Sequence, residues 1–211
     1  MIATVALVAL FFISCTKKDV AKEKVVYETD FSFDDGNWYT GEIKPGISAT
    51  IADGYYNFVT ATNGGRNSFT KTWFQSSTGK GMAVETSVKS FKVDVPGTDN
   101  TWGYSSLLFG RKDDNNAFYL SIVADRYMIF AYLNSSSYTI LKDWTTDAVV
   151  NANQFNRLRV ELKNGQLNYL INGKLVYTMQ SPISTLDLFG FHVAPYSAMQ
   201  ADYIKAVELL D

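Results

Sequence analysis

The segment from residue 156 to 177 constrains the fold of this chain most. It holds two Asn-Gly pairs, Asn164-Gly165 and Asn172-Gly173, and alternating apolar residues flank each of them. A two-residue type I′ turn needs positive φ at both central positions, which Asn and Gly tolerate best. Residues 156–163 also alternate apolar with charged side chains, as a strand with one face in the core does. The segment therefore predicts consecutive antiparallel hairpins.

Turn signals recur along the rest of the chain at the spacing expected for a β-sandwich or barrel. No long stretch repeats its apolar residues with the period of a helix. The sequence predicts an all-β fold, a two-sheet antiparallel jelly-roll β-sandwich, formed by one domain over residues 25–211. The remaining strands are expected at residues 25–33, 47–51, 55–60, 69–74, 81–94, 103–110, 117–124, 127–133, 138–144, 186–193 and 201–210.

The N-terminus has the pattern of a secretion signal. Residues 2–13 are one apolar run, shorter than the ~20 residues that span a bilayer but suited to a signal-peptide core. Phe12-Ile13-Ser14-Cys15 resembles a bacterial lipobox, and Cys15 is the only cysteine. We expect a lipoprotein signal peptide over residues 1–15 and lipidation of Cys15. The alternative is a cleaved signal peptide that happens to contain a cysteine, and no Lys or Arg precedes the apolar run.

The segment after Cys15 is charged and lacks aromatic residues, so residues 16–24 are expected to form a flexible tether. Thr16 stands where enteric lipoproteins retained in the inner membrane have Asp. The resemblance therefore implies a cell-envelope location with an outer-membrane anchor.

The charge balance excludes some partners. The chain has 19 basic and 21 acidic residues, a formal net charge of -2, which gives no footprint for nucleic acid. Membrane contact is expected through the lipid anchor only. Aromatic residues make up 15% of the chain and charged residues 19%. That composition suits uncharged polar ligands, although it also suits ordinary β-sheet packing.

Several segments together resemble a known superfamily. They are residues 102–111, 113–119, 156–160 and 171–174, with residues 30–38 and 201–207 at the two ends. Their order is similar to that in the concanavalin A-like lectin/glucanase superfamily. Within that superfamily, the segments most resemble laminin-G-like jelly rolls and the DUF1080 group (3-keto-disaccharide hydrolase-like) of Bacteroidetes lipoproteins. The resemblance covers almost the whole mature chain, and it implies the fold more firmly than an activity.

The catalytic motif of that superfamily is missing. Its retaining glucanases carry Glu-x-Asp-x-x-Glu on one strand, where alternation brings the carboxylates together. The only Glu-x-Asp here is Glu28-Thr29-Asp30, and Phe33 takes the place of the second Glu. His192 is the sole histidine, too few for a zinc site and without a nearby nucleophile motif. It could be a general base, a hydrogen-bond partner for a sugar hydroxyl, or simply a strand residue.

Calcium is the one metal that the resemblance suggests. Related jelly rolls hold a structural calcium between the first and last strands, and calcium takes oxygen ligands. The matching candidates are Asp30, Asp34 and Asp202.

A glycan site needs aromatic rings that stack on sugars and polar groups that bind their hydroxyls. The candidates are Trp73, Trp102, Tyr104, Arg111, Tyr127, Tyr132, Trp144, His192 and Tyr196. Each aromatic residue could instead fill the core between the sheets.

These observations favour a lipid-anchored protein whose jelly-roll domain binds an oligo- or polysaccharide without catalysis. One alternative is a hydrolase of the DUF1080 type, which would need carboxylates beside His192. The other is a structural or protein-interaction module of the laminin-G type, which would show a large exposed apolar patch without a groove.

Overall fold

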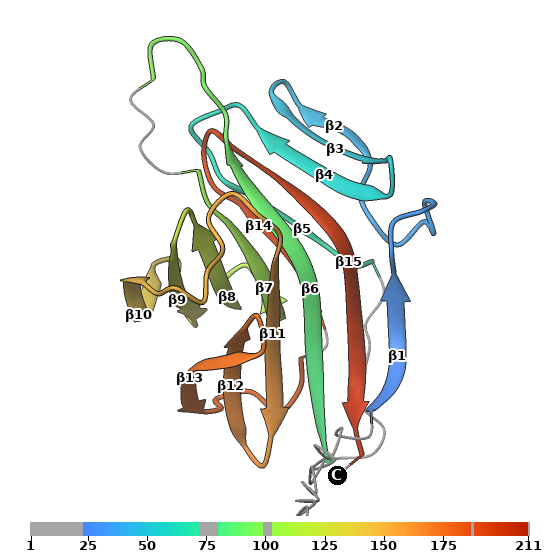
Figure 1. Cartoon of the computed structure of the whole chain (residues 1–211), viewed down its shortest axis with the longest axis vertical. Helices are drawn as coiled ribbons and strands as arrows, with labels where there is room; N and C mark the ends of the chain where they lie inside the picture. Colours follow the sequence, from blue (N-terminus) through green and yellow to red (C-terminus); the bar gives the residue numbers. More distant parts are fainter. Residues whose placement is uncertain (1–22, 72–79, 99–102, 187, 211) are drawn as a thin grey trace, which may run out of the picture.

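The computed structural model of the chain describes residues 23–71, 80–98, 103–186 and 188–210. These residues form two antiparallel sheets (Figure 1), so the predicted jelly-roll sandwich is confirmed. No helix in these ranges is long and apolar enough to cross a membrane. The large sheet contains β1 (Glu23–Thr29), β2 (Gly41–Lys44), β3 (Ile47–Ala52), β4 (Tyr55–Thr60), β6 (Gly81–Lys92), β11 (Asn156–Lys163), β12 (Gln166–Ile171), β13 (Lys174–Gln180) and β15 (Ser197–Leu209). The small sheet contains β5 (Arg66–Phe69), β7 (Ser105–Asp113), β8 (Asn116–Val123), β9 (Arg126–Leu133), β10 (Tyr138–Thr146) and β14 (Gly190–Val193).

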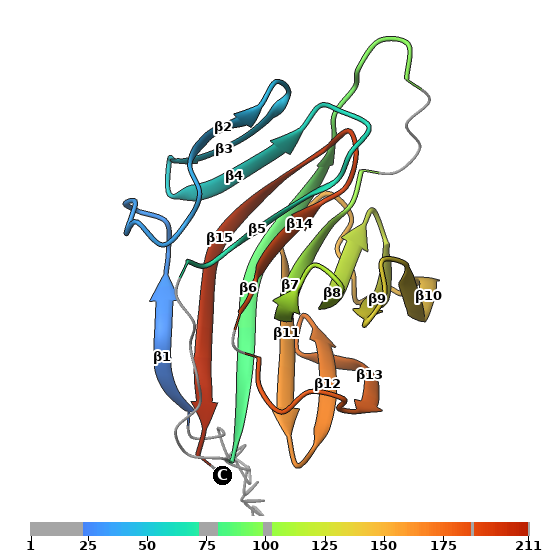
Figure 2. The ribbon, with the colours of Figure 1, turned by 180° about the vertical axis from the view of Figure 1, so that it is seen from behind.

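The strand order mixes neighbours in sequence with long crossovers. The large sheet runs β13-β12-β11-β6-β15-β4-β3-β2, with β1 also paired to β15, and the small sheet runs β10-β9-β8-β7-β14-β5. Strands β14 and β15, late in the chain, thus lie inside the two sheets. Figures 1 and 2 show β6 and β15 side by side along the length of the molecule, with β1 along the lower part of β15.

The two Asn-Gly turns form as predicted. Asn164 and Gly165 have φ of 52° and 71°, and Asn172 and Gly173 have φ of 50° and 82°. The resulting hairpins place Leu158 opposite Ile171 and Val160 opposite Tyr169. Local turn chemistry therefore sets the register of β11, β12 and β13.

The boundaries differ from the prediction at a few elements. β1 includes Glu23, which the sequence assigns to the tether, and ends at Thr29 instead of residue 33. The strand ends there because Phe31 has φ of 56° and turns its ring into the core beside Trp38. β5 covers residues 66–69 instead of 69–74, and β14 begins at residue 190 instead of 186. Residues 72–74 of the expected strand lie outside the described part of the chain.

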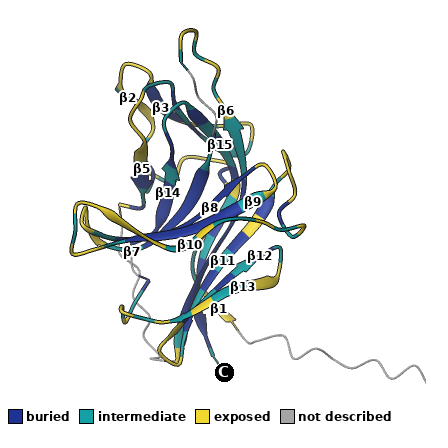
Figure 3. Cartoon of the chain, turned by 90° about the vertical axis from the view of Figure 1, so that its left-hand side faces the viewer, coloured by how far each residue is buried: buried dark blue, intermediate teal, exposed yellow. Residues whose placement is uncertain are grey.

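The main core lies between the sheets, and a second apolar cluster lies on the other face of the small sheet. Phe118, Leu120 and Ile122 of β8 point into the main core. By alternation, Tyr119 points the opposite way, where it packs with Phe130 and their neighbours. Figure 3 shows buried strand centres, with exposed residues concentrated in loops and edge strands. The small sheet therefore has two apolar faces, of which only one is covered by the large sheet.

Candidate functional site

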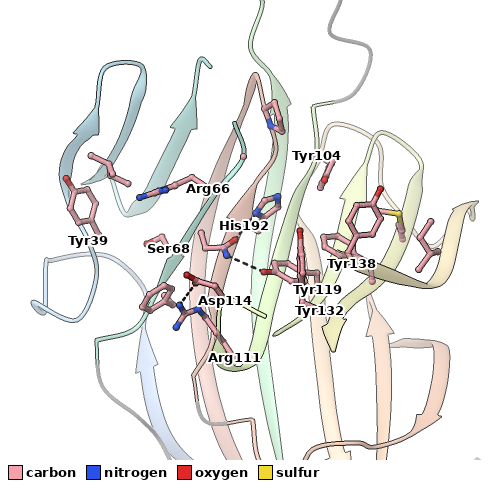
Figure 4. A pocket seen from close by; sticks show the side chains of 18 of the residues that line it. Tyr39, Arg66, Ser68, Tyr104, Arg111, Asp114, Tyr119, Tyr132, Tyr138 and His192 are labelled. Atoms are coloured by element: carbon pink, nitrogen blue, oxygen red, sulfur yellow. Dashed lines mark hydrogen bonds and ion pairs between the residues drawn. The ribbon is translucent and has the colours of Figure 1, made fainter. Parts of the chain in front are cut away.

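A groove of about 1070 Å³ lies on the face of the small sheet that points away from the main core. Ligand sites in proteins usually enclose roughly 300–1,000 Å³, so this groove is large enough for an extended ligand. Its residues come from β5, β7, β8, β9, β10 and β14 and from the segments around β2 (Figure 4). They are Tyr39, Ile43, Gly65, Arg66, Asn67, Ser68, Phe69, Lys71, Tyr104, Arg111, Asp114, Tyr119, Met128, Phe130, Tyr132, Tyr138, Ile140, Asp143, Trp144, His192 and Pro195.

Aromatic rings form much of the groove surface. Tyr119 and Phe130 face each other across β8 and β9, with ring centroids 4.4 Å apart and an interplanar angle of 6°. Both are almost fully buried, at 3% and 4% exposure, and they form the floor. Tyr104 and Trp144 meet edge to face at 5.5 Å. Tyr138 is 55% exposed at the β10 edge, so it offers a ring to a ligand.

A chain of hydrogen bonds crosses the floor. Asn67 Oδ1 lies 2.8 Å from His192 Nδ1, and Asn67 Nδ2 donates to the Tyr119 hydroxyl at 3.2 Å. Because an amide oxygen only accepts, Nδ1 must carry the proton, and Nε2 of neutral His192 is left as an acceptor. The Tyr119 hydroxyl keeps its proton to donate elsewhere. His192 Nε2 and the Tyr119 hydroxyl thus offer an acceptor and a donor suited to a hydroxyl ligand.

Burial moves the pKa of each of His192, Tyr119 and Tyr104 in the direction that favours its neutral form. It lowers the pKa of His192 to about 4, and it raises the pKa of Tyr119 and of Tyr104 to about 12. All three are therefore neutral at pH 7. Gly65 makes room for the imidazole, because a Cβ there would lie 2.9 Å from His192 Cε1 and 3.2 Å from Nε2.

Among the described residues that line the groove, three are cations and two are carboxylates. Arg111 Nη2 binds Asp114 Oδ1 at 2.6 Å, and its guanidinium lies 4.3 Å from the centre of the Phe69 ring. Lys71 Nζ donates to the Gly36 carbonyl at 2.8 Å. Arg66 is exposed, and its guanidinium makes no hydrogen bond or ion pair with another described residue.

The two carboxylates lie far apart. Asp143 of β10 lies between the residues that pair with Ile129 and Tyr127 of β9, so its level along β8 is that of Ser121. Asp114 lies in the β7–β8 turn, so its level along β8 is that of Asn116. Ser121 and Asn116 are five residues apart, which corresponds to about 16 Å along a strand. A glycosidase pair needs roughly 5–9.5 Å between its carboxyl groups, so Asp114 and Asp143 do not form one.

Five of the candidate residues lie together in the groove: Tyr104, Arg111, Tyr132, Trp144 and His192. Tyr127 and Tyr196 do not line it. Tyr127 is on the core face of β9, with its hydroxyl 3.4 Å from the Val176 carbonyl, because it is one residue out of phase with Met128 and Phe130. Tyr196 lies in the β14–β15 turn with φ of 52°, where its amide donates to the Thr62 carbonyl. Trp73, Trp102 and Cys15 lie outside the described residues.

Asn67, Tyr119, Phe130 and Tyr138 also line the groove and were not among the residues predicted from the sequence. A signal for the last three was present, since the hairpin registers pair Tyr119 with Phe130 and Tyr138 with Tyr132. Phe130 and Tyr132 are two residues apart on one strand, so their side chains share a face, and the paired Tyr119 and Tyr138 lie on that face too. Asn67 had no such signal, because β5 joins β14 through a contact between distant parts of the chain.

The three calcium candidates do not come together. Asp30 Oδ1 accepts the Ser32 amide at 3.0 Å, and Asp34 Oδ1 accepts the Gly36 amide at 2.8 Å. Within the described ranges, no three His, Cys, Asp or Glu side chains form a group that could hold a metal. Asp30, Asp34 and Asp202 therefore do not fit a carboxylate-built calcium site, and calcium binding stays a prediction of the resemblance.

The two sheets and their crossovers form a jelly-roll β-sandwich. No protein-family model matches this sequence, and no curated protein sequence matches it. Solved structures do match, at low identity. The catalytic domain of an endo-1,3-β-glucanase (laminarinase) from Thermotoga petrophila RKU-1 has a TM-score of 0.61 at 11% identity, covering 91% of this chain and 100% of that one.

Two further structures extend the comparison. An endo-β-1,3-glucanase from Pyrococcus furiosus has a TM-score of 0.62 at 8% identity, covering 92% of this chain and 97% of its own. The carbohydrate-binding module CBM66 from Bacillus subtilis has a TM-score of 0.55 at 18% identity, covering 78% and 91%. At such identities the likeness establishes the shared fold.

Proposed function

We propose that this protein binds a glycan in the groove of the small sheet and does not cleave it. The observation that carries this proposal is the combination of aromatic rings with neutral hydrogen-bonding groups on one open face. Tyr138, Trp144 and Tyr104 offer surfaces for the apolar faces of sugar rings. The Tyr119 hydroxyl and His192 Nε2 offer a donor and an acceptor for sugar hydroxyls. Carbohydrate-active and carbohydrate-binding proteins among the structural neighbours agree with this proposal.

Hydrolysis of the DUF1080 type is the alternative. Neutral His192 in the groove could act as a base. A glycosidase mechanism also needs two carboxyl groups at the bond to be cleaved. Asp114 is tied to Arg111 and lies about 16 Å along the sheet from Asp143. This geometry favours binding over cleavage, and the groove itself favours a glycan over the flat surface expected of a laminin-G-type interaction module.

A glycan array with the whole protein tests the proposal, followed by mass spectrometry of each bound glycan after long incubation. We expect saturable binding with the glycan recovered intact. Conversion of the glycan would establish the hydrolase instead. Failure to bind any member of a broad array would contradict a glycan-binding groove.

We also propose that Cys15 anchors the protein to the cell envelope, by default in the outer membrane. The support is in the sequence: an apolar leader, a lipobox-like segment and a single cysteine. Metabolic labelling with an alkyne fatty acid should mark the wild type and not Cys15→Ser. Equal labelling of the two proteins would contradict the anchor.

A further inference from the structure

The charges of the groove are separated into two halves. The cationic half, defined by Arg66, Lys71 and Arg111, lies at β5 and the adjoining end of β7, and Asp114 is its one carboxylate. The aromatic half, defined by Tyr104, Phe130, Tyr132, Tyr138 and Trp144, contains no cation among the residues that line it. Figure 4 shows Arg66 and Arg111 on one side of His192, and Tyr104, Tyr132 and Tyr138 on the other.

The bulk composition does not explain this separation, because the chain has a net charge of -2. The cationic half has three cations against one carboxylate, whereas Asp143 stands near the aromatic half. Potentials in a groove add over its charged groups, so a ligand that lies along this groove meets a positive potential at one end.

The side chains of the three cations differ in how many of their donors are already used. The Arg66 guanidinium is exposed and makes no hydrogen bond or ion pair with another described residue. Lys71 Nζ donates one hydrogen bond to the Gly36 carbonyl, and the side chain remains exposed. Arg111 is held by the Phe69 ring and by Asp114, and its Nε is buried with no acceptor in the described structure. The half therefore has free donors for an anion, and an arginine whose position is already set.

We infer that the groove binds an acidic glycan, whose sugar rings lie on the aromatic half and whose anionic substituent meets Arg66 and Lys71. The substituent is a carboxylate or a sulfate, both of which accept charge-assisted hydrogen bonds. This inference rests on the proposed glycan-binding function and adds to it the chemical class of the ligand.

Matched polysaccharides test the inference. Binding of the whole protein is measured to polygalacturonate and to its methyl ester, and to dextran sulfate and to dextran. The first pair isolates the carboxylate and the second isolates the sulfate, each on one backbone. At about 50 mM NaCl we expect at least one anionic polymer to bind about fivefold or more tighter than its neutral partner, and about 200 mM NaCl to reduce the difference.

Two double variants locate the effect. Arg66→Gln/Lys71→Gln removes two exposed cations of the groove and should abolish most of the preference for the anionic polymer. Lys163→Gln/Lys174→Gln removes two cations from the large sheet and should keep the preference. Equal binding of the charged and neutral polymers, no binding of either anionic polymer, or an unchanged preference in Arg66→Gln/Lys71→Gln would each overturn the inference.

A failure of the proposed glycan binding can be distinguished from a failure of the acidic preference. If a neutral glycan binds and Tyr138→Ala weakens it, the groove binds glycans and only the acidic preference is wrong. If Tyr138→Ala binds every polymer as the wild type does, the groove is not the glycan site, whatever the charge dependence.

Discussion

The hydrogen-bonded residues on the floor of the groove, Asn67, Tyr119 and His192, are polar without being charged. His192 is held by Asn67, and burial lowers its pKa to about 4, so the imidazole stays neutral over the pH range in which an isolated histidine titrates. A neutral imidazole with a protonated Nδ1 presents a fixed acceptor at Nε2. Such a group can bind a hydroxyl equally well at pH 6 and pH 8. We therefore expect glycan binding to be independent of pH across that range.

The same pKa makes a prediction about stability. Between pH 6.5 and about 4, unfolded His192 binds a proton that the folded protein excludes, so the folded state loses stability as the pH falls through this window. His192→Gln should show a flatter dependence of its unfolding free energy over the same range, measured by urea titration at several pH values. Carboxylates with lowered pKa values lose their contribution mainly below this window. An identical pH profile in the two proteins would contradict a lowered pKa of His192 in the folded protein.

At the scale of single elements, one arginine joins three strands of the large sheet. Arg159 of β11 contacts Glu23 of β1 at 2.5 Å, Glu85 of β6 at 3.2 Å and Glu161 of its own strand at 2.7 Å. Burial alone would raise the pKa of Glu85. The hydrogen bond from Tyr203 and the charges of Lys205 and Arg159 instead hold the pKa below its ordinary value. This network fixes the start of β1 against the sheet.

Arg159→Met should therefore be destabilising. It leaves Glu85, which is almost buried, without its arginine partner, and it leaves the acidic groups of three strands close together. We expect a loss of about 2–3 kcal/mol, below the full cost of breaking a buried ion pair because Glu23 and Glu161 are partly exposed. The urea midpoint measures it. Lys163→Met, on the same strand and face, should change stability by less than about 0.5 kcal/mol. Equal midpoints for the two variants would rule out this role for Arg159.

Elements whose partners are near in sequence could be predicted from the sequence. The Asn-Gly turns set β11, β12 and β13, and the turns at residues 53–54, 111–116 and 134–137 set the β3–β4, β7–β8 and β9–β10 hairpins. The insertion of β14 and β15 into the sheets could not be read in the same way. It depends on pairings such as His192 with Asn67 and Ala201 with Val88, which no local turn specifies. β2 was missed because it is short and mostly exposed.

On the scale of the whole molecule, the groove lies on the face of the small sheet that the large sheet does not cover. The large sheet covers one face, and the other carries Tyr119, Phe130 and the rings around them. The residues that line the groove come from distant parts of the chain, from Tyr39 to Pro195. Composition and local pattern could supply the aromatic residues, and Tyr104, Tyr132 and Trp144 were recognised in that way. Which of them share a face follows only from register and topology.

The most direct test of glycan binding in the groove compares two exposed aromatic residues. Tyr138 is 55% exposed and lines the groove, whereas Phe33 is 68% exposed and lies outside it. Neither truncation should disturb the core, so differences report on binding. The measurement is the affinity of Tyr138→Ala, Phe33→Ala and wild type for a glycan found on the array. We predict a loss of at least about fivefold for Tyr138→Ala and wild-type affinity for Phe33→Ala. Wild-type affinity in Tyr138→Ala, or an equal loss in both variants, would contradict a glycan site in this groove.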